Sequence, residues 1–298
     1  MTLRWQEIIR QKSDTTLWQQ LLNKLEQQLD PAISQPGLIE QFYLPLFFYL
    51  HEQATDKRPG SFIVGINAPQ GGGKSTLTSW LVKLFGWSGL HAVTLSIDDF
   101  YLTRAEQLLL AQSHPDNPYL QQRGYPGTHD IALGTAILTQ LKQRSTPALA
   151  LPRYDKSRHQ GQGDRIEMSQ WPQVQQPVDV VLLEGWMLGF QPVPVSSLTD
   201  RHLLQVNTLL QDYTDWHRQL DSFVYLRPQD ASYVIDWRTE AERRMKAKGL
   251  PGMTEEEVRA YAEKFLPAYH LYGPALASEP SIASSFLQIV IGKNRLPV

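Results

Sequence analysis

Apolar residues along the chain follow two patterns, which together predict strands alternating with helices. Short apolar runs rich in β-branched residues are typical of buried parallel strands, and they occur at Phe62–Ile66, His91–Ile97, Val178–Leu183, Asp221–Leu226 and Phe286–Ile291. The segments between them predict helices over residues 74–85, Ile131–Leu141, Ala231–Lys248 and Thr254–Lys264. This alternation predicts an α/β fold with a mostly parallel sheet and helices on both of its faces.

Residues 1–58 precede the first predicted strand, and we expect them to form a helical addition packed on a main domain over residues 59–298. A leucine stripe at helical spacing runs from Leu17 to Leu29, and Asp30-Pro31 ends it. A second helical stretch, Leu38–Gln53, is apolar and aromatic. Its Phe and Tyr side chains could contact a cofactor, but packing on the sheet is the interpretation we favour.

The stretch Phe62–Thr76, FIVGINAPQGGGKST, joins a predicted strand to a predicted helix through three consecutive glycines. This order is that of a P-loop, in which backbone N–H groups and the positive end of the helix dipole hold a phosphate. We expect Lys74 to reach the β- and γ-phosphates of ATP and Ser75 to bind Mg²⁺. The predicted nucleotide-binding residues are Ala68, Pro69, Gln70, Gly71, Gly72, Gly73, Lys74, Ser75 and Thr76.

One position departs from the P-loop pattern, because Ala68 stands where the motif has its first glycine. Alanine is tolerated there if the backbone φ angle is negative. The alternative is a glycine-rich surface turn with an incidental lysine. The flanking strand and helix favour the P-loop, and with it a P-loop NTPase fold.

Acidic residues follow two of the predicted strands, where ligands bind in open α/β sheets. Asp98-Asp99 follow the second strand, and Glu184 follows Val178–Leu183. A carboxylate there can accept the proton of an alcohol that attacks the γ-phosphate, which is the role predicted for Asp98. Glu184 can hold Mg²⁺. The alternative is that these acids are helix caps or solvated loop residues.

Several segments resemble known kinases. Ser96–Tyr101 is similar to the S-x-D-x-F-Y segment of the uridine kinase, pantothenate kinase and phosphoribulokinase group. Four further segments resemble plant-type D-glycerate 3-kinases. They are R-G-x-P-G-T-H-D at Arg123–Asp130, P-x-Y-D-K-S at Pro152–Ser157, G-x-G-D-R at Gly161–Arg165, and Leu183-Glu184-Gly185-Trp186. The resemblance covers roughly residues 60–298. It implies a P-loop kinase domain in which Asp98 is the base and ATP with Mg²⁺ converts D-glycerate to 3-phosphoglycerate.

The loops that carry these segments are suited to a small anionic acceptor. Arg123 or Arg165 could bind a carboxylate with two parallel hydrogen bonds, and Tyr154 and Lys156 add donors. Ordinary surface-loop charge is the alternative for each. The chemistry alone leaves uridine, pantothenate or a sugar phosphate open as acceptors. The predicted catalytic residues are Asp98, Lys74 and Glu184, and the predicted acceptor-binding residues are Asp98, Tyr101, Arg123, Thr128, His129, Asp130, Tyr154, Lys156 and Arg165.

The predicted helix Ala231–Lys248 is basic. Its arginines have two interpretations, and the sequence leaves both open. Arg238, Arg243 and Arg244 could belong to a lid that brings an arginine onto the transferring phosphoryl group, as the related kinases imply. The alternative is a solvated helix face, since Glu240 and Arg244 form an i,i+4 pair. We favour the lid.

Composition limits the other function classes. The net charge of −2 gives no basic field for nucleic acid or an anionic membrane, and the absence of cysteine excludes disulfides and thiolate catalysis. No apolar run is long enough to span a membrane, so we expect a cytoplasmic protein. The expected partner is the small-molecule acceptor. The sequence does not indicate an oligomeric state. A regulatory P-loop NTPase without a small acceptor is the alternative function.

Overall fold

The computed structural model describes residues 3–29, 35–56, 59–144, 147–175, 177–247, 249, 252–278 and 282–298. Two predicted helix ends lie outside these residues. They are Asp30-Pro31, after the leucine stripe, and Lys248, at the end of the helix predicted from Ala231. Within the part of the chain that is described, no helix is both long and apolar enough to cross a lipid bilayer.

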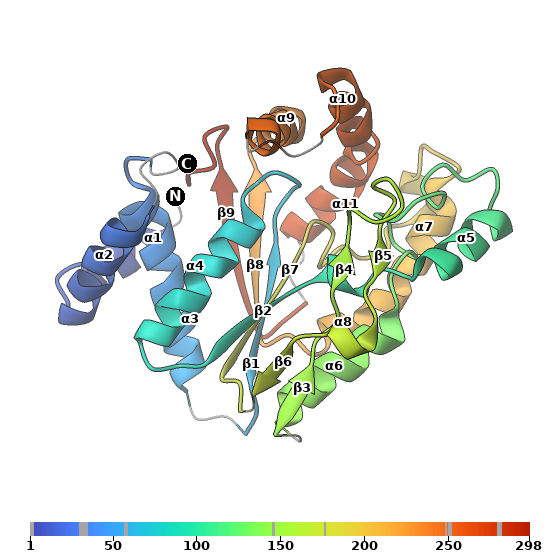
Figure 1. The fold of residues 1–298 in the computed structure, drawn as a ribbon. Helices are drawn as coiled ribbons and strands as arrows, with labels where there is room; N and C mark the ends of the chain where they lie inside the picture. The colour runs from blue at the N-terminus through green and yellow to red at the C-terminus, as the bar shows by residue number, and fades with distance from the viewer. Residues whose placement is uncertain are drawn as a thin grey trace.

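A parallel sheet forms the centre of the molecule (Figure 1). Its strands are β1 (Phe62–Asn67), β2 (Ala92–Ser96), β7 (Val180–Gly185), β8 (Ser222–Pro228) and β9 (Ser285–Ile291). They lie in the order β2-β7-β1-β8-β9, and each neighbouring pair is parallel. The P-loop strand β1 is therefore central, with β7 on one side and β8 on the other.

Side chains of the strands alternate between two apolar cores, as the two-residue period of a strand requires. In β1, Phe62 and Val64 face one core and Ile63 faces the other. In β7, Leu182 joins the first core and Leu183 the second. Both faces of the sheet are thus covered, which explains why these strands read as continuous apolar runs.

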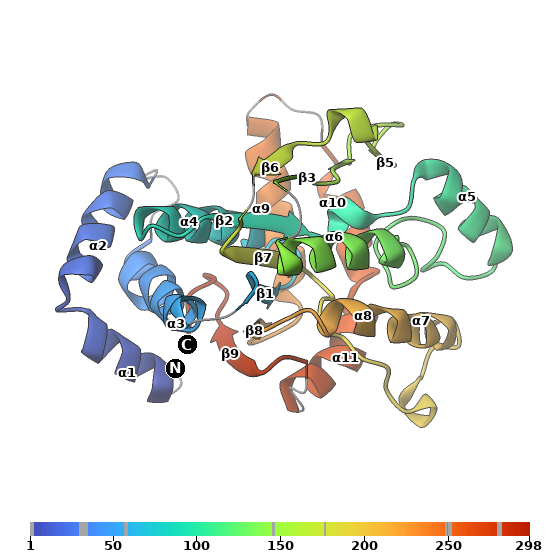
Figure 2. The ribbon, with the colours of Figure 1, turned by 90° about the horizontal axis from the view of Figure 1, so that it is seen from below.

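The first core lies against the N-terminal helices and the P-loop helix. Helices α1 (Leu3–Lys12), α2 (Thr16–Gln28), α3 (Leu44–Thr55) and α4 (Lys74–Trp87) occupy this side, and Figure 2 shows them grouped together. Buried residues of α2 and α3 belong to the same apolar core as β1. The division of the chain at residue 58 stays a prediction.

The other helices lie over the opposite face or across the carboxyl ends of the strands (Figures 1 and 2). Two short antiparallel strand pairs, β3–β6 and β4–β5, stand beside the sheet. The bounds of these elements are α5 (Arg104–Ser113), α6 (Ile131–Gln143), α7 (Leu203–Leu209), α8 (Thr214–His217), α9 (Tyr233–Ala247), α10 (Glu255–Glu263), α11 (Leu266–Ser278), β3 (Ala148–Ala150), β4 (Tyr154–Asp155), β5 (Asp164–Arg165) and β6 (Gln173–Gln175).

The prediction of an α/β fold with a mostly parallel sheet and helices on both faces is confirmed. The helix predicted over Leu38–Gln53 differs in detail, because it begins with a π-helical turn, η1 (Ile39–Tyr43), before α3. The sequence did not predict α11, which is apolar on all sides and contains Pro274. A helix without a polar face has no 3.6-residue pattern to detect.

Candidate active site

The P-loop has the backbone conformation that its glycines predict. Gly71 and Gly73 have φ angles of +73° and +88°, in the left-handed region that favours glycine. Gly73 is the N-cap of α4, whose first residue is Lys74. Ala68 is fully buried and does not have a positive φ angle, so the departure from the motif costs no backbone strain.

Two distant segments hold the P-loop in place. Tyr269 of α11 accepts a hydrogen bond of 3.0 Å from the Gln70 amide. Arg295, in the turn after β9, donates to the Gly71 carbonyl over 2.9 Å and forms an ion pair with Glu240 of α9. The loop is therefore braced from both sides before a nucleotide binds.

Ser75 and Glu184, both predicted to hold Mg²⁺, contact each other. The Ser75 hydroxyl donates to Oε1 of Glu184 over 3.1 Å, because the end of β7 lies beside the start of α4. Oε2 of Glu184 is buried and has no hydrogen-bond partner among the described residues. Burial raises the pKa of Glu184, and the positive charge of Lys74 opposes that rise.

This pair fits a magnesium ion. A carboxylate with a free oxygen and a hydroxyl are the hard oxygen donors that Mg²⁺ prefers. Among the residues that the structure describes, no cluster of three or more His, Cys, Asp or Glu side chains could hold a metal alone. A bound Mg²⁺ would therefore depend on phosphate oxygens and water for its remaining ligands, as is usual in kinases.

Lys74 points toward the acidic residues of the site. Its ammonium group donates to the Pro69 carbonyl over 3.3 Å. Burial lowers the pKa of Lys74, while the carboxylates of Glu184 and Asp98 act in the opposite direction. The predicted catalytic residues Lys74, Glu184 and Asp98 are thus brought to one edge of the sheet, although they come from three separate segments.

Asp98 lies in the 3-10 turn η2 (Ile97–Phe100) directly after β2, and it forms an ion pair with Lys156. The Lys156 ammonium group is 2.5 Å from Oδ2 of Asp98. Burial alone would raise the pKa of Asp98, but Lys156, with smaller effects of Lys74 and His129, brings it down to about 2. Asp98 is therefore a carboxylate at neutral pH, as a proton acceptor must be.

Asp99, the second acid of the pair, holds the structure around Asp98. It accepts hydrogen bonds from the amides of Ser96 and Tyr154, both over 3.3 Å, and from the Arg153 guanidinium over 3.1 Å. These bonds attach the segment that carries Lys156 to the end of β2. The two adjacent acids thus have different surroundings. At the level of sequence, composition and spacing do not distinguish them, and only the family resemblance gives the base role to Asp98.

His129 is buried in an aromatic cage. Its ring stacks on Tyr101 with 4.4 Å between ring centroids, and Nδ1 lies 2.6 Å from the hydroxyl of Tyr213. That hydroxyl accepts a bond of 3.1 Å from the Gly127 amide and could either donate to Nδ1 or accept from it. We assign the form in which it donates, because its buried proton then has an acceptor. The His129 proton then lies on Nε2, which has no partner among the described residues.

The charge of His129 follows from the same surroundings. Burial lowers its pKa to about 3, although the nearby Asp98 carboxylate acts to raise it. At neutral pH the ring is therefore neutral, with one N–H group available to a bound molecule. Sequence reasoning gave no indication of Tyr213, because 84 residues separate it from His129.

The other predicted acceptor-binding residues form the surrounding wall, where most already have protein partners. Arg123 donates to the Gly161 and Gln162 carbonyls and lies over the Tyr154 ring. Arg165 pairs with Asp130 over 2.9 Å, and Asp130 also caps α6. Thr128 is fully buried and donates to the Tyr125 carbonyl over 2.7 Å. Their contacts with an acceptor stay predictions.

The three arginines predicted for a lid point in different directions. Arg238 pairs with the buried Glu242 over 3.3 Å, and its charge acts on Lys74. Arg243 pairs with Glu255 of α10, where both side chains are exposed. Arg244 forms the expected pair with Glu240 over 2.5 Å. Of the three arginines, Arg238 is therefore the one whose charge acts on the P-loop lysine, and the lid role stays a prediction.

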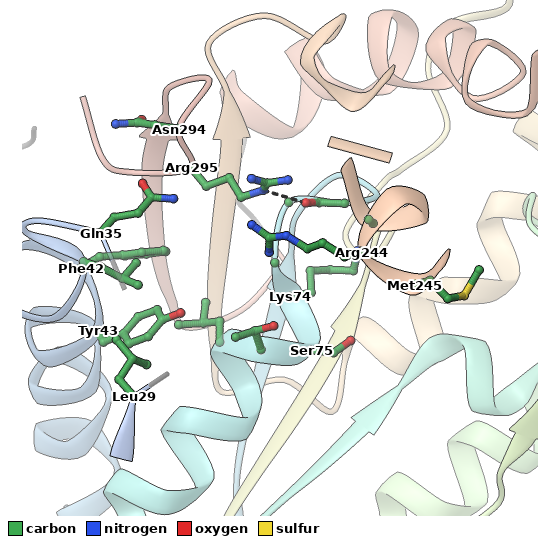
Figure 3. A pocket seen from close by; sticks show the side chains of 17 residues that line it. Leu29, Gln35, Phe42, Tyr43, Lys74, Ser75, Arg244, Met245, Asn294 and Arg295 are labelled. Atoms are coloured by element: carbon green, nitrogen blue, oxygen red, sulfur yellow. Dashed lines mark hydrogen bonds between the residues drawn. The ribbon is translucent and has the colours of Figure 1, made fainter. Parts of the chain in front are cut away.

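A cavity of about 500 Å³ adjoins the P-loop (Figure 3), and Asp98 is not among its described lining residues. Its floor runs from Gly71 to Leu77, and its walls come from three further segments. These are the N-terminal addition, α9 and the turn after β9, which contribute Leu29, Gln35, Leu38, Phe42, Tyr43, Ala241, Arg244, Met245, Asn294 and Arg295. From the sequence, α9 is the proposed lid, and a cofactor contact is only the less favoured interpretation of the N-terminal aromatic residues. The sequence did not connect the turn after β9 with the site.

Comparisons with known proteins match this chain to kinases along most of its length. No family model matches the chain. A chloroplastic D-glycerate 3-kinase of Arabidopsis thaliana is 38% identical over a matched length of 288 residues, with 91% of this chain and 63% of that protein covered. An uncharacterized kinase of Schizosaccharomyces pombe is 38% identical over 265 residues, with 85% of this chain and 95% of that protein covered.

Solved structures agree with the sequence relatives. The D-glycerate 3-kinase of Cryptococcus neoformans superposes with a TM-score of 0.75 and 34% identity, covering 86% of this chain and 95% of that one. Identity above 30% over 95% of each of these two fungal proteins extends well beyond the length of the P-loop. The chain therefore belongs to the D-glycerate 3-kinase family of P-loop kinases.

Proposed function

We propose that this chain is an ATP-dependent kinase that transfers the γ-phosphate of ATP to a hydroxyl group of D-glycerate, giving 3-phosphoglycerate. The observation that carries the proposal is the meeting of two half-sites at one edge of the sheet. The P-loop with Lys74, Ser75 and Glu184 suits the phosphates, and Asp98 with its neighbours suits the acceptor. The relatives in Arabidopsis and Cryptococcus are named D-glycerate 3-kinase.

In this mechanism each residue has a role that its surroundings support. The P-loop amides and Lys74 bind the phosphates. Ser75 and Glu184 would hold Mg²⁺, which when bound neutralises phosphate charge. Asp98 accepts the proton of the attacking hydroxyl, since its carboxylate is ionised at neutral pH. Lys156 and the Nε2–H group of His129 hold the acceptor beside Asp98.

The chemistry of the acceptor side favours a small anion. Lys156 is a cation whose pKa, though lowered by burial, is raised above its usual value by Asp98. The rings of Tyr101 and Tyr154 meet edge to face at 5.3 Å and so leave no parallel pair between which a nucleobase could stack. D-glycerate, with one carboxylate and two hydroxyl groups, offers partners to both charged and neutral donors.

The test is acceptor-dependent release of ADP. D-glycerate, uridine, pantothenate and a sugar phosphate are each supplied with ATP and Mg²⁺, and the phosphorylated product is identified. We expect D-glycerate to give turnover and 3-phosphoglycerate. Turnover with another acceptor alone would reassign the substrate. ATP hydrolysis without dependence on any acceptor would favour a regulatory NTPase.

A cytoplasmic location, with no nucleic-acid or membrane partner, is part of the same proposal. The proposal of this location rests on the composition of the chain. The Arabidopsis relative, by contrast, is named as a chloroplastic protein. Fractionation of cells with an antibody against this protein tests it.

A further inference from the structure

The proposed kinase reaction indicates which part of ATP would occupy the cavity beside the P-loop. The γ-phosphate must lie near Asp98, on the side of the P-loop where Lys74 and Glu184 interact. The cavity is lined by Lys74, Ser75 and the exposed Thr76 on the first turn of α4, but neither Asp98 nor Glu184 is among its described lining residues. The nucleoside half of a nucleotide held by this P-loop would therefore enter the cavity.

The walls of the cavity have the chemistry that a flat heteroaromatic base needs. Leu38 and Phe42 supply apolar surface from the N-terminal addition, and Met245 supplies it from α9. Arg244 adds a guanidinium group, and Asn294 adds a side-chain amide (Figure 3). A volume of about 500 Å³ is within the range of small-molecule sites. Apolar walls with a few polar groups are typical of such sites.

The wall from the N-terminal addition is built by an unusual piece of backbone. Leu38, Phe42 and Tyr43 lie at or within the π-helical turn η1, which precedes α3. A π-helical turn is rare, and such turns are frequent at functional sites. The turn brings two consecutive aromatic side chains to the P-loop side of the addition, as Figure 3 shows for Phe42 and Tyr43.

We infer that the N-terminal addition is part of the nucleotide site and that Leu38 and Phe42 bind the base of ATP. The inference rests on the proposed kinase function and extends it to the residues that recognise the nucleoside. Residues 38–43 then have two roles, since the same turn packs against α2, α3 and α4 in the first apolar core and forms one wall of the base site.

The experiment compares ATP with inorganic tripolyphosphate, which has the phosphates without the nucleoside. Dissociation constants for both are measured by calorimetry with Mg²⁺ on the full chain and on Phe42→Leu. Loss of an aromatic contact to a base weakens binding by about 5- to 150-fold when alanine replaces the ring. Leucine keeps part of the apolar contact, so we expect about 5-fold weaker ATP binding. Tripolyphosphate binding should not change.

Phe48→Leu is the matched control. Phe42 and Phe48 are both 5% exposed and both belong to the N-terminal core, but Phe48 stacks on Trp18 and does not line the cavity. We expect Phe48→Leu to leave the ratio of the two constants unchanged. Equal losses in both variants, equal losses of both ligands in Phe42→Leu, or no loss in Phe42→Leu would each overturn the inference.

A second measurement uses the unaltered protein, so it does not depend on whether a variant folds. The photoreactive analogue 8-azido-ATP is irradiated with the full chain, and the labelled peptides are identified by mass spectrometry. Label within residues 35–43 supports the inference, and label confined to other segments overturns it. If the protein binds neither ATP nor tripolyphosphate, the kinase proposal fails as well. If ATP binds but Phe42 has no effect, only the base wall fails.

Discussion

The ammonium group of Lys156 lies 2.5 Å from the Asp98 carboxylate, although the two residues are 58 positions apart in the chain. This pair keeps Asp98 ionised in a place where burial would otherwise favour the protonated acid. It also places a positive charge beside the point where the acceptor hydroxyl must lie. The first predictions follow from this one relationship.

Asp98→Asn should abolish most acceptor phosphorylation. The amide keeps the shape of the side chain but cannot take the hydroxyl proton, and loss of a general base costs about 10²–10⁴-fold. ATP binding should stay nearly normal, because the P-loop is unaltered. The measurement is D-glycerate-dependent ADP release, with nucleotide binding followed by calorimetry.

Asp99→Asn is the matched control for that variant. Asp99 binds Arg153 and two backbone amides, so its replacement should mainly lower the melting temperature. The rate of phosphoryl transfer should fall less than in Asp98→Asn. A loss of turnover in Asp99→Asn as large as that in Asp98→Asn, at unchanged melting temperature, would contradict the assignment of the base.

Lys156→Met should change the pH dependence of kcat/KM. The pKa of Asp98 is depressed to about 2, so in the unaltered protein Asp98 contributes no acid limb above pH 5. Without the cation, burial raises that pKa, and activity is lost at a higher pH than before as the pH falls. A pH–rate profile for both proteins tests this. Coincident acid limbs would show that Lys156 does not control Asp98.

Tyr213→Phe should change the balance between the Nε2–H and Nδ1–H tautomers of His129. The Tyr213 hydroxyl is the Nδ1 partner, so without it the Nε2–H form is no longer favoured. The ¹⁵N chemical shifts of the His129 ring report the tautomer directly, and His129→Gln identifies its signals. We expect an Nε2–H ring in the unaltered protein, with a higher acceptor KM in Tyr213→Phe. An Nδ1–H ring in the unaltered protein would contradict the assignment.

The sheet and the P-loop could be predicted because their signals are local. A buried parallel strand is a short apolar run, and the P-loop glycines lie next to each other in the chain. The strand boundaries in the structure fall within two residues of the predicted ones. Family resemblance added the segments around Asp98, which composition and spacing alone leave ambiguous.

The cavity wall could not be predicted, for a physical reason. Phe42 and Leu38 are apolar and nearly fully buried, as core residues are, so their sequence pattern is that of a core helix. Only the three-dimensional path of the π-helical turn shows that they also border a cavity. The different roles of Asp98 and Asp99 are likewise fixed by partners more than 50 residues away.

Arg238→Gln should reduce kcat, whereas Arg243→Gln should not. Both arginines lie on α9 and pair with a glutamate, but only the charge of Arg238 acts on Lys74. An arginine at the transferring phosphoryl group is worth about 10³–10⁵-fold in related chemistry, so a loss of 10-fold or more is expected. Steady-state kinetics on both variants, with melting curves, test this. Equal kcat values would remove Arg238 from the lid.

The last prediction compares two glycines of the P-loop that share a backbone conformation but differ in their neighbours. Gly71 and Gly73 have φ angles of +73° and +88°, so alanine at either position costs about 1–2 kcal/mol of strain. A Cβ atom at Gly71 would lie 2.8 Å from the backbone of Trp237, whereas one at Gly73 would meet nothing within 4 Å. Gly71→Ala must therefore shift the loop or α9, and we expect a larger loss of ATP affinity than in Gly73→Ala. Calorimetric binding of ATP and thermal melting of both variants test this, since strain alone would lower stability by a similar amount in each. If Gly73→Ala loses as much ATP affinity as Gly71→Ala, the close approach of α9 does not determine the shape of the nucleotide site.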